Sequence, residues 1–215
     1  MTASLPAPSS RASSTGAHAR HVVLVRHGET EWSRITRHTG RSDVPLDPEG
    51  EAQARRLGPR LREWRFAEVL YSPLQRARRT CELAGLAAGA RPDPDLQEWD
   101  YGDYEGRTAD EIRAGRPGWA IWRDGVVGGE TVADVGRRAD AVIERVLAVE
   151  GDVALFAHGH LLRILAARWC RLPAVTGERL ALSPASVSVL GYERESSVIA
   201  LWNDTSHLTA GPSAR

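Results

Sequence analysis

The sequence predicts an α/β fold, a three-layer α/β/α sandwich with a mainly parallel central sheet. Three short apolar runs, at 21–25, 67–72 and 152–157, are typical of strands that are buried on both faces of a sheet. Each run is followed along the chain by a segment whose apolar residues have helical spacing. Strands that alternate with helices favour a parallel sheet that is covered by helices on both sides.

Five helices are expected from the spacing of the apolar residues. Gly58 and Pro59 should bend or split the first of them, because proline clashes with the preceding turn of a helix. Pro73 suits the first turn of the second helix, and Thr131 is a candidate N-cap for the helix that follows it. The expected helices span 48–64, 73–86, 108–114, 131–149 and 160–172.

The remaining regular structure is expected in a closing pair of strands, at 186–193 and 197–203. Between 93 and 130 the chain is rich in Gly, Asp and aromatic residues, and we expect an irregular excursion there. Neither an internal repeat nor a second domain is visible, so one domain over 21–205 is predicted. The chain of 215 residues is long enough for one α/β domain with a sizeable core.

Both ends of the chain are expected to be tails, a disordered one at 1–20 and a C-terminal one at 206–215. The first is rich in Ser, Ala and Pro and lacks the apolar stretch of a secretory signal. No stretch approaches the roughly 20 apolar residues that a membrane span needs. Cys81 and Cys170 lie in helix-like segments, which favours a reduced, cytoplasmic protein, although a single disulfide stays open.

The charge balance excludes several classes of function. Positive and negative residues number 28 each, so there is no overall field to attract nucleic acid or an anionic membrane, and neither is expected as a partner. All the basic residues are arginine. The absence of lysine excludes P-loop and Schiff-base chemistry, because both need a lysine amine. Because the net charge is zero, any site for an anion must come from a local cluster of positive groups.

Such a local site is predicted where the three buried strands end. Ligands of open α/β folds bind beyond the carboxyl ends of the strands. Arginine offers planar, permanently charged donors for phosphate oxygens, and the first turn of a helix adds oriented amides. Glu98, Asp100, Asp103 and Glu105 offer candidate proton donors in the excursion. The strand-end residues are Arg26, His27, Ser72, Pro73, Arg76, His158, Gly159 and His160.

Taken together, the motifs of this chain resemble those of a known family. The chain contains, in this order, VRHGETEWS, TGRSDVPLDPEG, YSPLQRARRT, LQEWDYGDYEG, GGET and FAHGHLLR. The same order occurs in the histidine phosphatase superfamily, which has the phosphoglycerate-mutase-like fold. The likeness covers about residues 21–205. The residues within these motifs are most similar to those of the acid phosphatase and sedoheptulose-bisphosphatase-like branch.

The resemblance implies a role for each matching residue, and it implies no cofactor and no metal. His27 would be the nucleophile that becomes phosphohistidine, and Glu98 would be the general acid and then the base. Arg26, Arg76 and His158 would hold the phosphoryl oxygens. The implied substrate-binding positions are Arg26, Gly28, Ser33, Thr39, Gly40, Arg76, Glu98, Tyr101, His158 and Gly159.

The chemistry of these residue types supports the assignments. Neutral imidazole is a good nucleophile at neutral pH, because its reference pKa is about 6.5. A second, protonated histidine would balance the phosphate charge. Burial beside Trp99 would favour the protonated form of Glu98, which predicts an acidic pH optimum. The predicted function is a metal-independent phosphomonoesterase for small phosphorylated metabolites, with sugar phosphates to be tested early.

Several alternatives stay open. A mutase would return the phosphoryl group to the substrate instead of to water. A metal-dependent hydrolase would use His27, His158 and His160 as ligands, and a non-catalytic protein would only bind phosphorylated partners. His160 either binds substrate or stabilises its loop, and Glu130 either faces the pocket or caps a helix. A homodimer is also left open.

Overall fold

A six-stranded sheet in the order β3-β2-β4-β1-β5-β6 forms the centre of the fold in the computed structural model, which describes residues 21–209. The first four strands are parallel, β5 pairs antiparallel with β1, and β6 pairs antiparallel with β5. The predicted N-terminal tail, 1–20, lies outside the described residues. The strands are β1 (Val22–Arg26), β2 (Phe66–Tyr71), β3 (Arg91–Pro92), β4 (Asp152–Ala157), β5 (Val187–Glu193) and β6 (Ser196–Asp204).

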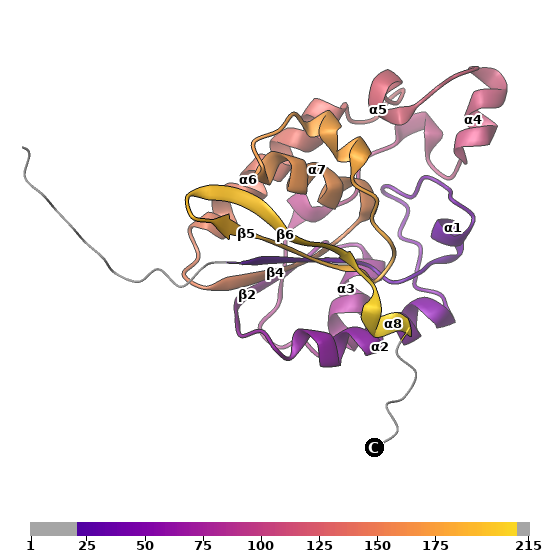
Figure 1. Cartoon of the computed structure of the whole chain (residues 1–215). Helices are drawn as coiled ribbons and strands as arrows, with labels where there is room; N and C mark the ends of the chain where they lie inside the picture. Colours follow the sequence, from indigo (N-terminus) through magenta and orange to yellow (C-terminus); the bar gives the residue numbers. More distant parts are fainter. Residues whose placement is uncertain (1–20, 210–215) are drawn as a thin grey trace, which may run out of the picture.

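Helices cover both faces of this sheet (Figure 1). α6 (Val132–Leu147) and α7 (Gly159–Trp169) pack on one face, and α2 (Pro48–Leu61), α3 (Gln75–Leu83) and α8 (Ser206–Thr209) pack on the other. Each layer has its own apolar cluster against the sheet. The three-layer, mainly parallel α/β/α architecture predicted from the sequence is confirmed.

The parallel pair of β1 and β4 places the candidate site. Val22 pairs with Val153 and Arg26 pairs with Ala157, so both strands end at the same level. Every β1 residue before Arg26 is at most 1% exposed, which explains the unbroken apolar run. The backbone N–H of His27 continues the ladder by donating to the carbonyl oxygen of Ala157 at 3.0 Å. The residues after the two strands therefore start side by side.

The first expected helix and the expected C-terminal tail differ from what the structure shows. The first expected helix is not split, since α2 runs unbroken through Pro59 and ends at Leu61. Pro59 lies close to the helix end, so few backbone hydrogen bonds remain to be lost beyond it. α8 lies inside the segment assigned to the C-terminal tail. Its Leu208 packs on the apolar cluster beside α2, and the carbonyl oxygen of Ala185 lies 3.0 Å from Nε2 of His207.

The excursion between β3 and α6 is built from short helices and turns. The expected helix near 108–114 is present, and Thr131 caps α6 as predicted. Thr30, Thr108 and Thr131 each form a reciprocal capping box that fixes the start of a helix. The short elements are α1 (Glu31–Arg34), α4 (Ala109–Gly115), α5 (Ile121–Asp124), and the 3-10 helices η1 (Pro94–Leu96), η2 (Gly102–Tyr104) and η3 (Ala174–Arg179).

Candidate active site

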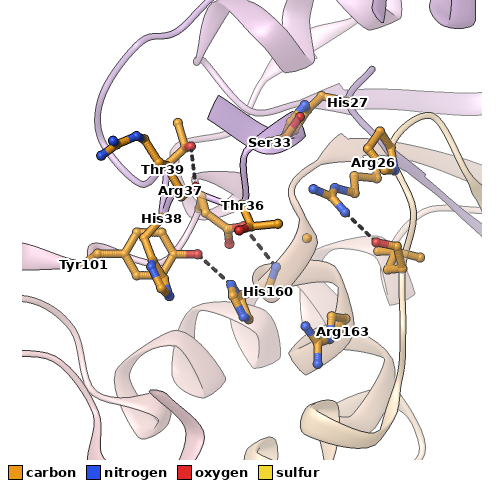
Figure 2. Close-up of a pocket in the computed structure, with 14 residues that line it drawn as sticks. Arg26, His27, Ser33, Thr36, Arg37, His38, Thr39, Tyr101, His160 and Arg163 are labelled. Carbon is orange, nitrogen blue, oxygen red and sulfur yellow. Dashed lines mark hydrogen bonds between the residues drawn. The ribbon is translucent and has the colours of Figure 1, made fainter. Parts of the chain in front are cut away.

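A pocket of about 290 Å³ opens beyond the ends of β1 and β4. Its wall combines the residues after these strands with the segment that follows α1 and with part of the excursion (Figure 2). It includes six of the residues predicted from the sequence for substrate contact, and it includes the predicted nucleophile. The lining residues are Arg26, His27, Ser33, Thr36, Arg37, His38, Thr39, Glu98, Tyr101, Gly159, His160, Arg163, Leu182 and Pro184.

His27 is held with one ring nitrogen free. Its Nδ1 lies 2.7 Å from the carbonyl oxygen of Gly28, which can only accept, so Nδ1 carries the proton. Nε2 therefore keeps its lone pair. Burial, and then the charges of Arg76 and Arg26, hold the pKa of His27 well below 6.5. The ring is thus a neutral imidazole, which is the state that the predicted role of His27 requires.

His158 lies behind His27, with 5.2 Å between the two ring centroids. Nε of Arg76 donates to Nδ1 of His158 at 3.2 Å, so the proton of His158 sits on Nε2 and points at Oγ of Ser72, 2.7 Å away. Burial, and then the Arg76 charge, hold the pKa of His158 well below 6.5. The expectation of a protonated second histidine is therefore wrong in the free enzyme, because an arginine occupies the acceptor nitrogen of that ring.

Arg76 is fully buried and is committed to backbone oxygens. Besides its bond to His158, it donates to the carbonyl oxygens of Thr39, Gly40 and Ser42 at 2.8–3.0 Å. Arg76 and His158 do not belong to the pocket wall, and they brace the site from behind His27. Burial lowers the pKa of Arg76, but a guanidinium stays charged at physiological pH.

Arg26 is one of three arginines that line the pocket, with Arg37 and Arg163, and it directly precedes His27. Nη1 donates to the carbonyl oxygen of Leu182. Nε is buried, and within residues 21–209 it has no hydrogen-bond partner. A Cβ added at Gly159 would lie 3.4 Å from Nε and Cζ of Arg26, so a glycine lets the first turn of α7 approach the guanidinium closely. An unpartnered buried N–H beside a helix N-terminus suits an anionic oxygen.

Glu98 faces the same end of α7. It is 5% exposed, and its carboxylate accepts backbone N–H bonds from Trp99, His160 and Leu161 at 2.9–3.0 Å. Two of these three donors belong to the first turn of α7, where oriented amides favour negative charge. The carboxylate is therefore fixed in direction, and Glu98 lines the same pocket as Arg26 and His160.

The other predicted substrate-binding residues divide into two groups. Ser33, Thr39 and Tyr101 line the pocket with Gly159. Gly28 and Gly40 are not in the wall. A Cβ at Gly28 would lie 2.4 Å from the carbonyl oxygen of Gly50, and one at Gly40 would lie 2.4 Å from that of Trp99. These two glycines therefore permit close backbone packing under the site.

Some wall residues were not found by sequence reasoning. Arg163 follows Gly159 by four residues on α7, a helical spacing that could have revealed it. Arg37 has no comparable signal. His160, left open above, lines the pocket, and so does His38, a candidate for the pocket rim from its place beside Thr39 in the sequence. Glu130 instead forms an ion pair with the guanidinium of Arg138 at 2.7 Å and does not face the pocket.

Within residues 21–209, no three His, Cys, Asp or Glu side chains converge in a way that could hold a metal ion. In the same part of the chain, no helix has the length and apolar character to cross a membrane. Cys81 and Cys170 are both free thiols, so the single disulfide left open above is not formed.

Comparison with known proteins gives a family match over most of the chain. The histidine phosphatase superfamily (branch 1) matches residues 22–205. An acid phosphatase of Mycobacterium tuberculosis is 38% identical over 205 residues, 91% of this chain and 100% of that protein. A sedoheptulose 1,7-bisphosphatase of Saccharomyces cerevisiae is 39% identical over 68% of this chain and 66% of its own length. A probable phosphoglycerate mutase of Salmonella paratyphi A is 34% identical over 88% and 95%.

Solved structures agree with these matches. One from an open reading frame of Mycobacterium tuberculosis superposes with a TM-score of 0.81 at 38% identity, covering 86% of this chain and 97% of that chain. The native mycobacterial glucosyl-3-phosphoglycerate phosphatase superposes with a TM-score of 0.77 at 29% identity, covering 87% and 100%. The resemblance inferred from the motifs is confirmed.

Proposed function

Since this chain belongs to the histidine phosphatase superfamily, we propose that its phosphoric monoester hydrolysis proceeds through a phosphohistidine at His27, with Glu98 as general acid and base. The observation that carries the proposal is the bond between Nδ1 of His27 and the carbonyl oxygen of Gly28. That bond leaves Nε2 as the nucleophilic atom of a neutral ring. Arg26 lines the same wall, and its guanidinium is the proposed donor for the phosphoryl oxygens.

The first step transfers the phosphoryl group to the enzyme. Nε2 of His27 forms a bond to phosphorus while the bond from phosphorus to the leaving oxygen breaks, and Glu98 gives that oxygen a proton. Arg26 and the first turn of α7 balance the charge of the three transferred oxygens. Splitting the hydrolysis into two displacements replaces one difficult step by two easier ones.

The second step regenerates the enzyme. Glu98, now ionised, takes a proton from a water molecule as the water oxygen attacks phosphorus, and the bond to Nε2 breaks. Inorganic phosphate leaves, and Glu98 holds the proton needed for the next turnover. The role of Arg76 and His158 as phosphoryl ligands stays a prediction, since both lie outside the pocket wall and brace His27 from behind.

Small sugar phosphates are the proposed substrates. The pocket of about 290 Å³ suits a small metabolite. The relatives named sedoheptulose 1,7-bisphosphatase and glucosyl-3-phosphoglycerate phosphatase support phosphorylated sugars and hydrolysis. The similarity to a probable phosphoglycerate mutase keeps one alternative, in which the phosphoryl group of phosphohistidine returns to a second hydroxyl.

The test follows phosphate release from phenyl phosphate between about pH 4 and pH 9 in excess chelator, for the wild type and for His27→Ala. We expect activity to survive the chelator and to vanish in His27→Ala. Quenching a turnover mixture in alkaline denaturant should trap phosphate on the wild-type chain, and acid should then release it, because the bond between phosphorus and an imidazole nitrogen is labile in acid. Activity that needs a metal, or that survives in His27→Ala, would contradict the mechanism. Isomerisation of phosphoglycerate without phosphate release would favour the mutase.

We also propose the cytoplasm as the location, supported by the two free thiols Cys81 and Cys170. Fractionation of cells that express the protein checks this directly. The homodimer stays a prediction, and sedimentation equilibrium of the purified chain checks it.

A further inference from the structure

Two imidazole rings form part of the pocket wall away from the phosphoryl end. His38 and His160 both line the pocket, and they lie with Tyr101 on the side opposite Arg26 (Figure 2). Their planes are parallel within 2°, with 6.5 Å between the ring centroids. In the described residues, Nδ1 of each ring has a hydrogen-bond partner and Nε2 of each ring has none. Both rings belong to the pocket wall, and neither Nε2 is among the buried side-chain atoms of residues 21–209 that lack a partner.

The bond that each ring makes fixes what its free nitrogen can do. Nδ1 of His38 lies 2.8 Å from the carbonyl oxygen of Arg107, which can only accept, so His38 carries its proton on Nδ1. Nε2 of His38 is therefore a hydrogen-bond acceptor. Burial lowers the pKa of His38, which keeps the ring neutral at physiological pH.

His160 is in the other tautomer, with its proton on Nε2. Its Nδ1 lies 2.6 Å from the hydroxyl oxygen of Tyr101, a side chain that is 2% exposed. Were Nδ1 protonated, the tyrosine hydroxyl hydrogen would have no acceptor in the described part of the chain, at a cost that a buried group rarely bears. Tyr101 therefore donates, and Nε2 of His160 carries the proton and is a donor. Burial raises the pKa of Tyr101 well above 10 and lowers that of His160 well below 6.5.

The two arginines at this end of the pocket, Arg37 and Arg163, already have hydrogen-bond partners. Arg37 is paired with Glu111 and with the carbonyl oxygen of Gly106. Arg163 donates to the carbonyl oxygens of Gly177 and Glu178, with its guanidinium 4.7 Å from the ring centroid of Trp122. The free hydrogen-bonding atoms of the two histidines are thus a neutral acceptor and a neutral donor.

The leaving group has to pass these two rings. Glu98 protonates the leaving oxygen, and the carboxylate of Glu98 accepts the backbone N–H of His160 at 3.0 Å. The carbon bonded to the leaving oxygen must therefore lie next to His160. A hydroxyl group both donates and accepts, so neighbouring hydroxyl groups match a donor and an acceptor that stand on one wall.

We propose that His160, oriented by Tyr101, and His38 are the residues that determine specificity, by binding hydroxyl groups of the leaving alcohol. The inference rests on the proposed function, since it places the leaving oxygen at Glu98. It assigns His160, whose role the sequence left open, to substrate selection, and it gives Tyr101 the role of a positioning residue.

The test compares a hydroxyl-rich substrate with one that has no hydroxyl on its leaving group. kcat/KM is measured for a sugar monophosphate, such as a hexose 6-phosphate, and for phenyl phosphate, and the quantity of interest is their ratio. We expect His160→Leu to lower this ratio about tenfold, which corresponds to the loss of one hydrogen bond. Tyr101→Phe should lower it by a smaller factor, because Nε2 is no longer held as the donor. His160→Gln, which keeps a donor, should restore part of the ratio.

A matched control is His21→Gln, which removes an imidazole at the opposite end of β1, where it pairs with Asp152. Its ratio should equal that of the wild type. An equal loss on both substrates in His160→Leu, with an unchanged ratio, would mean a structural role and would overturn the inference. The failure of the proposed function is recognised separately, as phosphatase activity that persists in His27→Ala on both substrates.

Discussion

Arg138 and Glu130 form a bidentate ion pair, with Nε and Nη2 of the arginine 2.7 and 2.9 Å from the two carboxylate oxygens. Each side chain is only 17% exposed. The same guanidinium donates to the carbonyl oxygens of Asp95 and Gln97 at 2.7 and 3.0 Å. The pair therefore clamps α6 to the segment that delivers Glu98 to the pocket.

We expect Arg138→Ala to reduce kcat about tenfold or more with a smaller change in KM, because Glu98 loses its fixed position. The free energy of unfolding should fall by about 2–4 kcal/mol, since Glu130 and two carbonyl oxygens lose their partner. Steady-state kinetics and urea unfolding measure both effects. Arg137→Ala is the control, as Arg137 is 70% exposed and pairs only with its helix neighbour Asp134. Equal effects of the two substitutions would contradict the positioning role.

Gly28 offers a second test, since its carbonyl oxygen sets the tautomer of His27. A Cβ at Gly28 would lie 2.4 Å from the carbonyl oxygen of Gly50, so the backbone under the nucleophile must move in Gly28→Ala. We expect a loss of about 1–3 kcal/mol in stability together with a fall in kcat. Gly115→Ala meets no atom within 4 Å and should change neither. Thermal unfolding and phosphatase assays compare the two variants, and a silent Gly28→Ala would refute the close packing.

The pH dependence of activity should reflect the environment of His27. Burial and the neighbouring arginines lower the pKa of this ring, and it is nucleophilic only when neutral. As pH falls through 6.5, an ordinary histidine would become protonated, whereas His27 stays neutral until the pH reaches its own lower pKa. We therefore expect kcat/KM to be sustained below about pH 6.5. A decline in kcat/KM centred at about 6.5 would show that the ring titrates like an exposed one.

The free energy of unfolding, unlike the activity, should decrease as the pH falls below about 6.5. His27, His158 and His160 all have a pKa well below 6.5 in the folded chain, mainly because of burial. In the unfolded chain they bind protons near 6.5, so their neutral burial contributes stability above that pH, which is lost as pH falls. Each ring adds a slope of at most about 1.4 kcal/mol per pH unit below 6.5. Urea unfolding at a series of pH values measures the slope, and a flat profile between about pH 6.5 and 5.5 would contradict it.

Five of the six strands and the long helices were predictable, because buried strands give unbroken apolar runs and long helices give a 3.6-residue period. β3 has only two residues, which is too short for such a run. The short excursion helices carry too few residues for a period, so only the one after Thr108 was foreseen. The motifs predict the nucleophile and the acid, and both residues lie on the pocket wall. The neutral state of His158 was beyond reach, because it depends on which nitrogen Arg76 occupies, a contact between residues far apart in the sequence. The wall position of Arg37 was missed for the same reason.

The central pairing of β1 with β4 has a consequence for folding during translation. Val22 finds its parallel partner only when Val153 has been synthesised, and α7 closes the site later still. A ribosome adds roughly 5–20 residues per second. The β1 segment therefore stays without its partner strand for several seconds, with its apolar side chains exposed to solvent. Contacts so distant along the chain also slow refolding. Chaperone demand during translation should accordingly fall on the β1 segment, and nascent chains halted before β4 should be inactive and prone to aggregate.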